Sequence, residues 1–118
     1  ENLQGIFKTM HQLPSDVQIK ISDNITFSKI EKRLQDYLPD ENLKFDLVYF
    51  DAFSPVVEPD LWTEEIFKNL HSMMNNEGVL VTYCSKGVVR RTMQACNFKT
   101  ERLPGPPGKH EMLRAIAV

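Results

Sequence analysis

The residue of this chain best placed to do chemistry is a carboxylate, Asp51. It directly follows the mostly apolar run Phe45–Phe50 and precedes Ala52, Phe53 and a turn at Pro55. In open α/β sheets, ligands bind outside the carboxyl ends of the parallel strands. An acid at that edge can accept or orient a proton of a reacting group. A buried strand that merely ends in a polar residue has the same pattern, so both interpretations stay open.

A second candidate group is basic and lies in the last third of the chain. Residues 1–84 carry seven Lys/Arg and fourteen Asp/Glu, a net charge of −7, whereas residues 85–118 carry seven Lys/Arg and two Asp/Glu, a net charge of +5. A basic surface on an acidic body is typical of proteins that bind a polyanion such as nucleic acid. A solvated surface with no partner would have the same composition. The cations concerned are Lys86, Arg90, Arg91, Lys99, Arg102, Lys109 and Arg114.

The composition indicates one soluble domain without a metal site. The 118 residues are 42% hydrophobic and 25% charged, which is ordinary for a globular protein with one core. No apolar run approaches the roughly 20 residues needed to cross a bilayer. Cys84 and Cys96 lack C-x-x-C spacing, and the three histidines are not spaced as metal ligands. We therefore expect a cytoplasmic protein with reduced thiols, no metal and no membrane partner.

The elements that position these residues alternate between helical and strand periods. Residues 6–13 are spaced as a helix ended by a proline, and residues 16–24 alternate as an exposed strand or extended loop. Ile25–Ile30 alternates as a second strand, and Glu31–Leu38 has the spacing of a short helix. The nearly continuous apolar run Phe45–Phe50 predicts a strand covered on both faces.

The second half of the chain continues this alternation. Thr63 is a suitable N-cap for a helix that runs to the turn at residues 75–78, and Ser85 is a suitable cap for the next helix. The order β-α-β-α-β-α-β-β predicts an α/β sheet, parallel up to a closing antiparallel hairpin. The predicted strands here are Val79–Cys84, Phe98–Leu103 and Glu111–Val118, and the helical stripes are Ile66, Phe67, Leu70, Met73 and Met74, then Val88, Val89, Met93 and Cys96.

Four ordered blocks of sequence resemble one known family. They are Asp51–Pro55, Pro59–Thr63, Val81–Arg91 and Glu101–Ala115. In this order and spacing they resemble the bacterial tRNA methyltransferases that finish the 5-methylaminomethyl-2-thiouridine modification of a wobble uridine. The resemblance covers the chain from about Ile25 onward.

The resemblance implies both the fold and the cofactor. That family has the Rossmann-like class I methyltransferase fold and uses S-adenosylmethionine. Ile25–Ile30 would be the third strand, Phe45–Phe50 the fourth and Val79–Cys84 the fifth. The chain would then be the C-terminal portion of one methyltransferase domain. Residues 1–24 would form an N-terminal helix and extended segment, and residues 25–118 would run from the third strand to the closing hairpin.

The same resemblance implies that part of the cofactor site would precede residue 1. The family's first strand, its Gly-rich loop and the acid after its second strand have no counterpart in this chain. Where the family has an acidic pair that contacts adenine, this chain has Lys32 and Arg33. The residues left for cofactor binding are Glu31, Asp51, Ala52 and Phe53.

The family's reaction transfers a methyl group from a sulfonium to a primary amine of the uridine side chain. The amine must be neutral to attack, so Asp51 would accept or orient its proton. Phe53 would face the base or the sulfonium, because aromatic rings attract cations, or else anchor the loop. Trp62 is interpreted as a packed anchor of the same loop. Contacts to tRNA are assigned to Lys86, Arg90, Arg91, Lys109 and Arg114.

Two other functions stay open. One is a non-catalytic module that keeps a methyltransferase-like fold and binds RNA or a protein. The other is a related enzyme that transfers an aminopropyl group and shares the acid after the fourth strand. The Pro-Gly loop before Lys109 and the Val89–Arg91 segment favour the tRNA enzyme over this second alternative.

The missing strands also have a physical consequence. The strand Phe45–Phe50 would have a bare apolar edge, which invites pairing with another strand. We expect either that Ile25–Ile30 docks on this edge or that two chains pair across it as a homodimer. Some members of the family also carry a fused flavin-dependent domain, which a longer parent of this chain could share.

Overall fold

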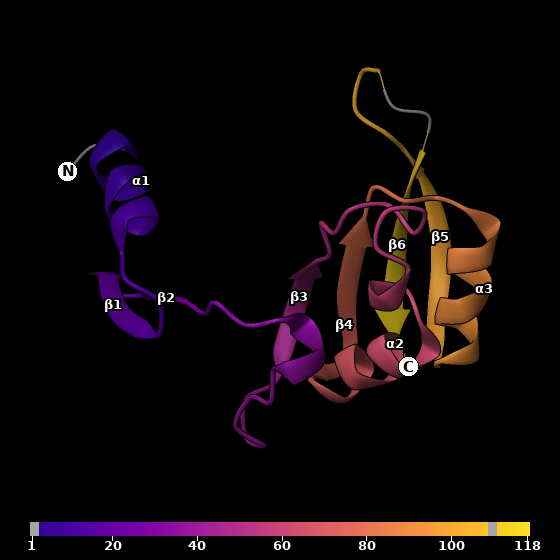
Figure 1. Cartoon of the computed structure of the whole chain (residues 1–118), viewed down its shortest axis with the longest axis horizontal. Helices are drawn as coiled ribbons and strands as arrows, with labels where there is room; N and C mark the ends of the chain where they lie inside the picture. Colours follow the sequence, from indigo (N-terminus) through magenta and orange to yellow (C-terminus); the bar gives the residue numbers. More distant parts are fainter. Residues whose placement is uncertain (1–2, 109–110) are drawn as a thin grey trace. The chain divides into compact units, whose positions relative to one another are not determined.

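The chain divides into two units, residues 1–36 and residues 37–118. The computed structural model describes residues 3–108 and 111–118. The first unit holds a helix and a two-stranded hairpin, and the second holds a four-stranded sheet with two helices (Figure 1).

The first unit contains the predicted helix and a hairpin of two strands. Helix α1 (Leu3–Gln12) precedes β1 (Val17–Ser22) and β2 (Ile25–Lys29), so the helix and both strands are confirmed. β2 pairs antiparallel with β1 in a two-stranded sheet, and the docking of Ile25–Ile30 on the strand Phe45–Phe50 stays a prediction. The two-residue turn 23–24 brings β1 and β2 together at a much smaller entropic cost than a distant strand would require.

The segment after β2 forms less helix than its spacing predicts. Only a single 3₁₀ turn, η1 (Leu34–Asp36), is present where a helix over Glu31–Leu38 was expected. Arg33 Nε lies 2.9 Å from Asp36 Oδ2, and this ion pair spans the turn. Pro39 follows shortly afterwards and disfavours helical backbone at the residue before it.

The second unit is built on a four-stranded sheet in the order β3-β4-β6-β5 (Figure 1). Its strands are β3 (Phe45–Tyr49), β4 (Met74–Thr82), β5 (Phe98–Pro104) and β6 (Glu111–Ala117). β3 and β4 are parallel, and the other two pairs are antiparallel. The predicted parallel sheet with a closing antiparallel pair is therefore confirmed.

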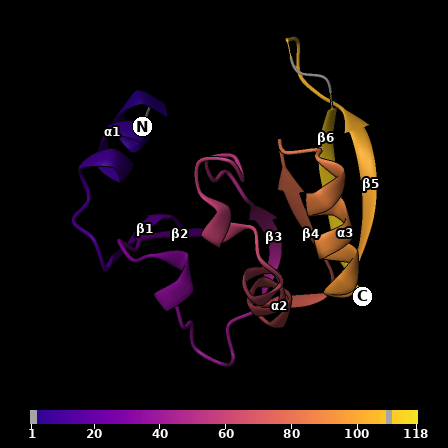
Figure 2. The same ribbon diagram turned by 45° about the vertical axis from the view of Figure 1, so that its right-hand side comes forward.

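Both helices of this unit, α2 (Glu64–Ser72) and α3 (Gly87–Ala95), lie on the same face of the sheet (Figure 2). They contact each other, and α3 also packs along β5. The core lies between these helices and the sheet. Its largest fully buried side chains are Phe67, Leu80, Val89, Met93 and Leu113.

The two helices begin differently from each other. Thr63 caps α2 as predicted, since its Oγ1 accepts a hydrogen bond from the Ile66 amide at 3.3 Å. Ser85 does not cap α3, because the backbone is still extended at the next residue. The N-cap is therefore Lys86, whose side chain makes no capping hydrogen bond.

Three residues of the predicted helical stripes do not lie on the buried face of a helix. Met73 is the C-cap of α2 and Met74 begins β4, so neither belongs to the helix, although both are buried. Val88 is 56% exposed on α3, because Val89 takes the buried position of that turn.

The opposite face of the sheet is partly open. Leu47 and Tyr49 are 49% and 77% exposed, so the predicted cover on both faces of Phe45–Phe50 is wrong within this chain. The reason is that α2 and α3 lie on one face only. The strand register places Tyr49 beside Val81, and Val81 beside Arg114, in one row of this open face.

Candidate active site

Asp51 lies at the carboxyl edge of the parallel strand pair, as the sequence predicts. The Phe50 amide donates a hydrogen bond to the Val81 carbonyl at 2.9 Å, which continues the ladder one residue beyond β3. Asp51 is the next residue, and it is exposed. Within the part of the chain that the structure describes, its carboxylate has no hydrogen bond or ion pair. The carboxylate is therefore free to accept a proton or a hydrogen bond from a ligand.

The loop that carries Asp51 is folded back on itself. The amides of Val57 and Glu58 both donate to the Ser54 carbonyl at 2.9 Å. A 3₁₀ turn, η2 (Pro59–Leu61), then leads to Trp62. The interpretation of Trp62 as a packed anchor is confirmed, because its side chain is only 7% exposed.

The two residues after Asp51 present different surfaces. Ala52 is half-buried, whereas the Phe53 ring is 71% exposed. The Phe53 side chain therefore does not anchor the loop in this chain. Its carbonyl does so instead, by accepting a hydrogen bond from Trp62 Nε1 at 2.8 Å. The exposed ring remains available to cover a base or a cationic sulfur.

The end of β4 adds residues that the sequence analysis did not single out. Thr82 is the one polar side chain among the buried residues described, and its Oγ1 accepts a hydrogen bond from the Cys84 amide at 3.3 Å. Tyr83 is 54% exposed beside it. Because β3 and β4 are parallel, these residues share an edge with Asp51. The sequence signal that could have identified Thr82 is its position at the end of the apolar run 79–81.

The cations at the start of α3 differ in their exposure to solvent. Lys86 and Arg91 are exposed, whereas Arg90 is half-buried and its Nε is shielded from solvent without a hydrogen-bond partner among the described residues. Arg91 folds back over Gly87, since a Cβ at Gly87 would lie 3.0 Å from its Nη1. Lys86 and Arg91 therefore both flank the first turn of α3. The positive end of the helix dipole adds to their attraction for anions.

The remaining predicted site residues are Arg114, Glu31 and Lys109. Arg114 is in the middle of β6, and its Nη2 lies 2.5 Å from Glu101 Oε2 on the neighbouring strand. Glu31 is an exposed residue of the first unit. Lys109 lies outside the described residues. The structure thus brings together Asp51 to Phe53 on one loop and places the α3 cations after the adjacent strand.

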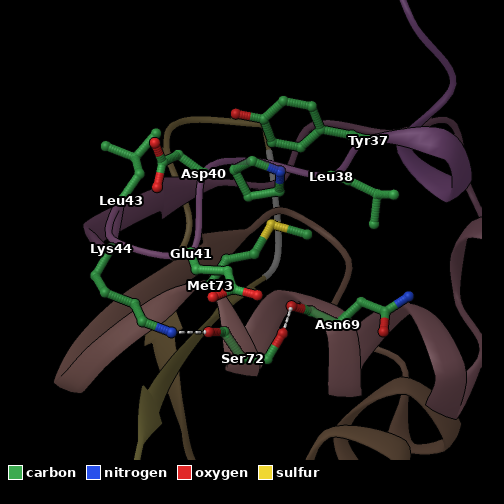
Figure 3. A pocket seen from close by; sticks show the side chains of 10 residues that line it. Tyr37, Leu38, Asp40, Glu41, Leu43, Lys44, Asn69, Ser72 and Met73 are labelled. Atoms are coloured by element: carbon green, nitrogen blue, oxygen red, sulfur yellow. Dashed lines mark hydrogen bonds between the residues drawn. The ribbon is translucent and has the colours of Figure 1, made fainter.

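A pocket of about 430 Å³ lies away from this edge (Figure 3). It is formed by the segment before β3 and by the C-terminal end of α2. Lys44 Nζ donates to the Ser72 carbonyl at 2.5 Å, and the Ser72 hydroxyl donates to the Asn69 carbonyl at 2.7 Å. The lining residues are Tyr37, Leu38, Pro39, Asp40, Glu41, Leu43, Lys44, Asn69, Ser72 and Met73. The pocket is thus at the amino end of β3, whereas Asp51 is at its carboxyl end.

The carboxyl edge of the β3–β4 pair presents a carboxylate and an aromatic ring. The Asp51 carboxylate and the Phe53 ring are both exposed on one loop and suit a cationic or amine group. No Gly-rich turn between a strand and a helix is present among residues 3–108 and 111–118. Those residues also contain no group of three acidic, His or Cys side chains able to hold a metal ion, and no helix long and apolar enough to cross a membrane.

Comparison with known sequences agrees with these features. Residues 2–117 match the model of a family described as S-adenosyl-L-methionine-dependent methyltransferase. The chain is 31% identical over its whole length to a tRNA 5-methylaminomethyl-2-thiouridine biosynthesis bifunctional protein MnmC of Pseudomonas syringae pv. tomato, of which it spans 18%. It is 40% identical over 76 residues to the protein of the same name from Paraburkholderia phymatum, of which it spans 12%. The chain thus spans less than a fifth of either relative.

Solved structures share the same architecture. The MNMC2 structure from Aquifex aeolicus matches 95% of this chain with a TM-score of 0.72 and 23% identity, over 35% of its own chain. The N-methyltransferase NodS from Bradyrhizobium japonicum matches 75% of this chain with a TM-score of 0.52 and 13% identity, over 57% of its own chain. Both likenesses support a methyltransferase-type α/β fold for this chain.

Proposed function

Because the chain belongs to the S-adenosyl-L-methionine-dependent methyltransferase family, we propose that it takes part in methyl transfer to the aminomethyl group of a tRNA wobble uridine. The relatives named above suggest this substrate. The single observation that carries the chemistry is the exposed Asp51 carboxylate, one residue beyond the β3–β4 ladder.

Asp51 would act on the amine nucleophile. A protonated amine has no lone pair with which to attack, so a carboxylate within hydrogen-bond reach can accept or orient its proton. S-adenosylmethionine, when bound, supplies the methyl group on a positively charged sulfur. Orientation of the reacting groups is the larger contribution, since it can lower a barrier by roughly 7–11 kcal/mol. The exposed Phe53 ring and the half-buried Ala52 would form one wall of that site, and Glu31 would contribute to binding of the cofactor.

The tRNA would be held mainly from the start of α3. Lys86 and Arg91 are exposed there, and phosphate contacts of this kind position a nucleic acid. Arg90 and Arg114 would contribute less, because Arg90 is half-buried and Arg114 already pairs with Glu101. Lys109 is proposed as a further contact from the resemblance alone. A tRNA substrate would place the protein in the cytoplasm.

The proposal includes two partners beyond tRNA. The relatives named above are described as bifunctional, which agrees with a second, flavin-dependent domain in a longer parent of this chain. β3 is also the terminal strand of its sheet, so one of its backbone edges is unpaired among the described residues. We propose that two copies of the chain can pair through this edge.

The first test is calorimetric titration of S-adenosylmethionine into the 118-residue chain, followed by methylation of undermodified tRNA with an Asp51→Ala control. Saturable one-to-one binding and methylation that depends on Asp51 are expected for a competent enzyme. Absence of a heat of binding at millimolar S-adenosylmethionine would show that this chain does not bind the cofactor unaided. RNA binding without cofactor binding or methylation would instead favour the non-catalytic module.

A further inference from the structure

Trp62 joins the loop of the candidate active site to the core. Its indole is 7% exposed and meets the Phe50 ring edge-on, with ring centroids 5.0 Å apart at 80°. It also lies 6.3 Å, centroid to centroid, from the buried ring of Phe67. On its polar side, Nε1 donates a hydrogen bond to the Phe53 carbonyl at 2.8 Å. This residue is the only tryptophan of the chain.

The backbone around Asp51 is fixed on both sides by this arrangement. Before Asp51, Phe50 is bound to β4 through its amide and to Trp62 through its ring. After Asp51, the first main-chain group with a hydrogen bond among the described residues is the Phe53 carbonyl, which accepts from Trp62 Nε1. The carboxylate itself has no partner among the described residues. Its position therefore depends on these two backbone attachments.

We propose that Trp62 is a positioning residue, whose indole N–H holds the Phe53 carbonyl and thereby fixes the Asp51 carboxylate. The importance of this hydrogen bond for catalysis rests on the proposed function. The attachment of the loop to Trp62 does not depend on that function. Trp62→Phe is the direct variant, because it keeps an aromatic ring against Phe50 and removes the donor.

The attachment is tested by amide hydrogen exchange on the whole 118-residue chain. The reporters are Val57 and Glu58, whose amides bond to Ser54 inside the loop. We expect Trp62→Phe to raise their exchange rates roughly fivefold, as loss of one hydrogen bond of ordinary strength allows. Core amides such as that of Leu80 should not change. Unchanged exchange in the loop would overturn the proposal.

Two further variants keep this test decisive. If Trp62→Phe lowers exchange protection throughout the chain, Trp62→benzothienylalanine replaces it, since this analogue keeps the bicyclic shape without the N–H. Thr100→Val is the matched control, because it removes the Gln94–Thr100 hydrogen bond of 2.9 Å away from the loop. That control should leave the exchange of Val57 and Glu58 unchanged.

The catalytic importance is tested by a double-mutant cycle with Asp51→Ala in the tRNA methylation assay. If Trp62 acts through Asp51, Trp62→Phe lowers kcat about tenfold with Asp51 present and has no further effect without it. Equal, additive losses in both backgrounds would overturn the positioning role. If the wild-type chain methylates no tRNA, the proposed function fails, and if Asp51→Ala keeps full activity, the proposed role of Asp51 fails. In both cases the exchange experiment still decides whether Trp62 holds the loop.

Discussion

At the scale of single residues, replacement of an exposed carboxylate can change the activity of a protein without changing its stability. Most replacements that destabilise a protein severely disturb a core, a buried polar group or a cap. Asp51 is none of these, since it is exposed and its carboxylate has no partner among the described residues. A change in activity at this position therefore reports chemistry directly.

Asp51→Asn removes the proton acceptor while keeping the size of the side chain. We expect kcat for methylation to fall about 10²-fold or more, as for loss of a general base. The free energy of unfolding should change by less than about 0.5 kcal/mol, as for other surface replacements. Single-turnover methylation and urea unfolding measure the two quantities. Retained activity would exclude Asp51 as the base.

The two thiols should differ in reactivity. Cys96 is buried, and burial, with a smaller contribution from Glu64, raises the pKa of its thiol, so its reactive thiolate fraction is low at neutral pH. Cys84 is half-buried just after β4. We expect iodoacetamide at about pH 8 to label Cys84 at least tenfold faster. Peptide mass analysis measures the rates, and both sites should react alike in denaturant. Faster labelling of Cys96 would show that α3 opens readily.

At the scale of helices and strands, α3 concentrates the proposed tRNA contacts at its first turn. Lys86 precedes the helix, and the Arg91 side chain returns over Gly87. Both charges therefore lie at the positive end of the helix dipole, where an anion is favoured. The helix follows the strand adjacent to β3, so this turn begins from the same sheet edge as Asp51.

Replacing these two cations should weaken tRNA binding without changing the fold. Lys86→Ala and Arg91→Ala are each expected to raise Kd about threefold to tenfold and to reduce the salt dependence by about one phosphate contact. Filter binding at several salt concentrations measures both effects. Lys68→Ala on the exposed surface of α2 is the matched control. An equal loss with Lys68→Ala would point to a diffuse charge effect instead.

The sequence predicts periodic elements better than it predicts their partners. The strand ending at Asp51 and the Thr63 cap follow from local spacing, and both are confirmed. The pairing of β2 with β1 does not follow from local spacing. It depends on the lower entropic cost of closing a two-residue turn than of bringing in a strand that is distant in the sequence. The hydrogen-bond acceptor of Trp62 could not be predicted from the sequence either, because it is the main-chain carbonyl of Phe53 and every residue type has such a carbonyl.

At the scale of the whole molecule, the sheet of residues 37–118 is covered by helices on one face and ends at an unpaired strand. Parallel strands normally have both faces covered, and an exposed edge tends to pair. Leu47 and Tyr49 combine these features, because they are exposed apolar residues on the terminal strand. This combination is the physical basis for the proposed pairing of two copies.

A positive charge on β3 should therefore reduce self-association. We expect the chain to form a dimer in sedimentation equilibrium and Tyr49→Lys to raise the dimer Kd about tenfold or more, because an edge lysine would have to lose its hydration on pairing. Val118→Lys is the matched control, since Val118 is 61% exposed but follows β6, an inner strand of the sheet. A wild-type chain that remains monomeric at high concentration would contradict the pairing. A Val118→Lys effect equal to that of Tyr49→Lys would show that added charge alone, and not the β3 edge, governs association.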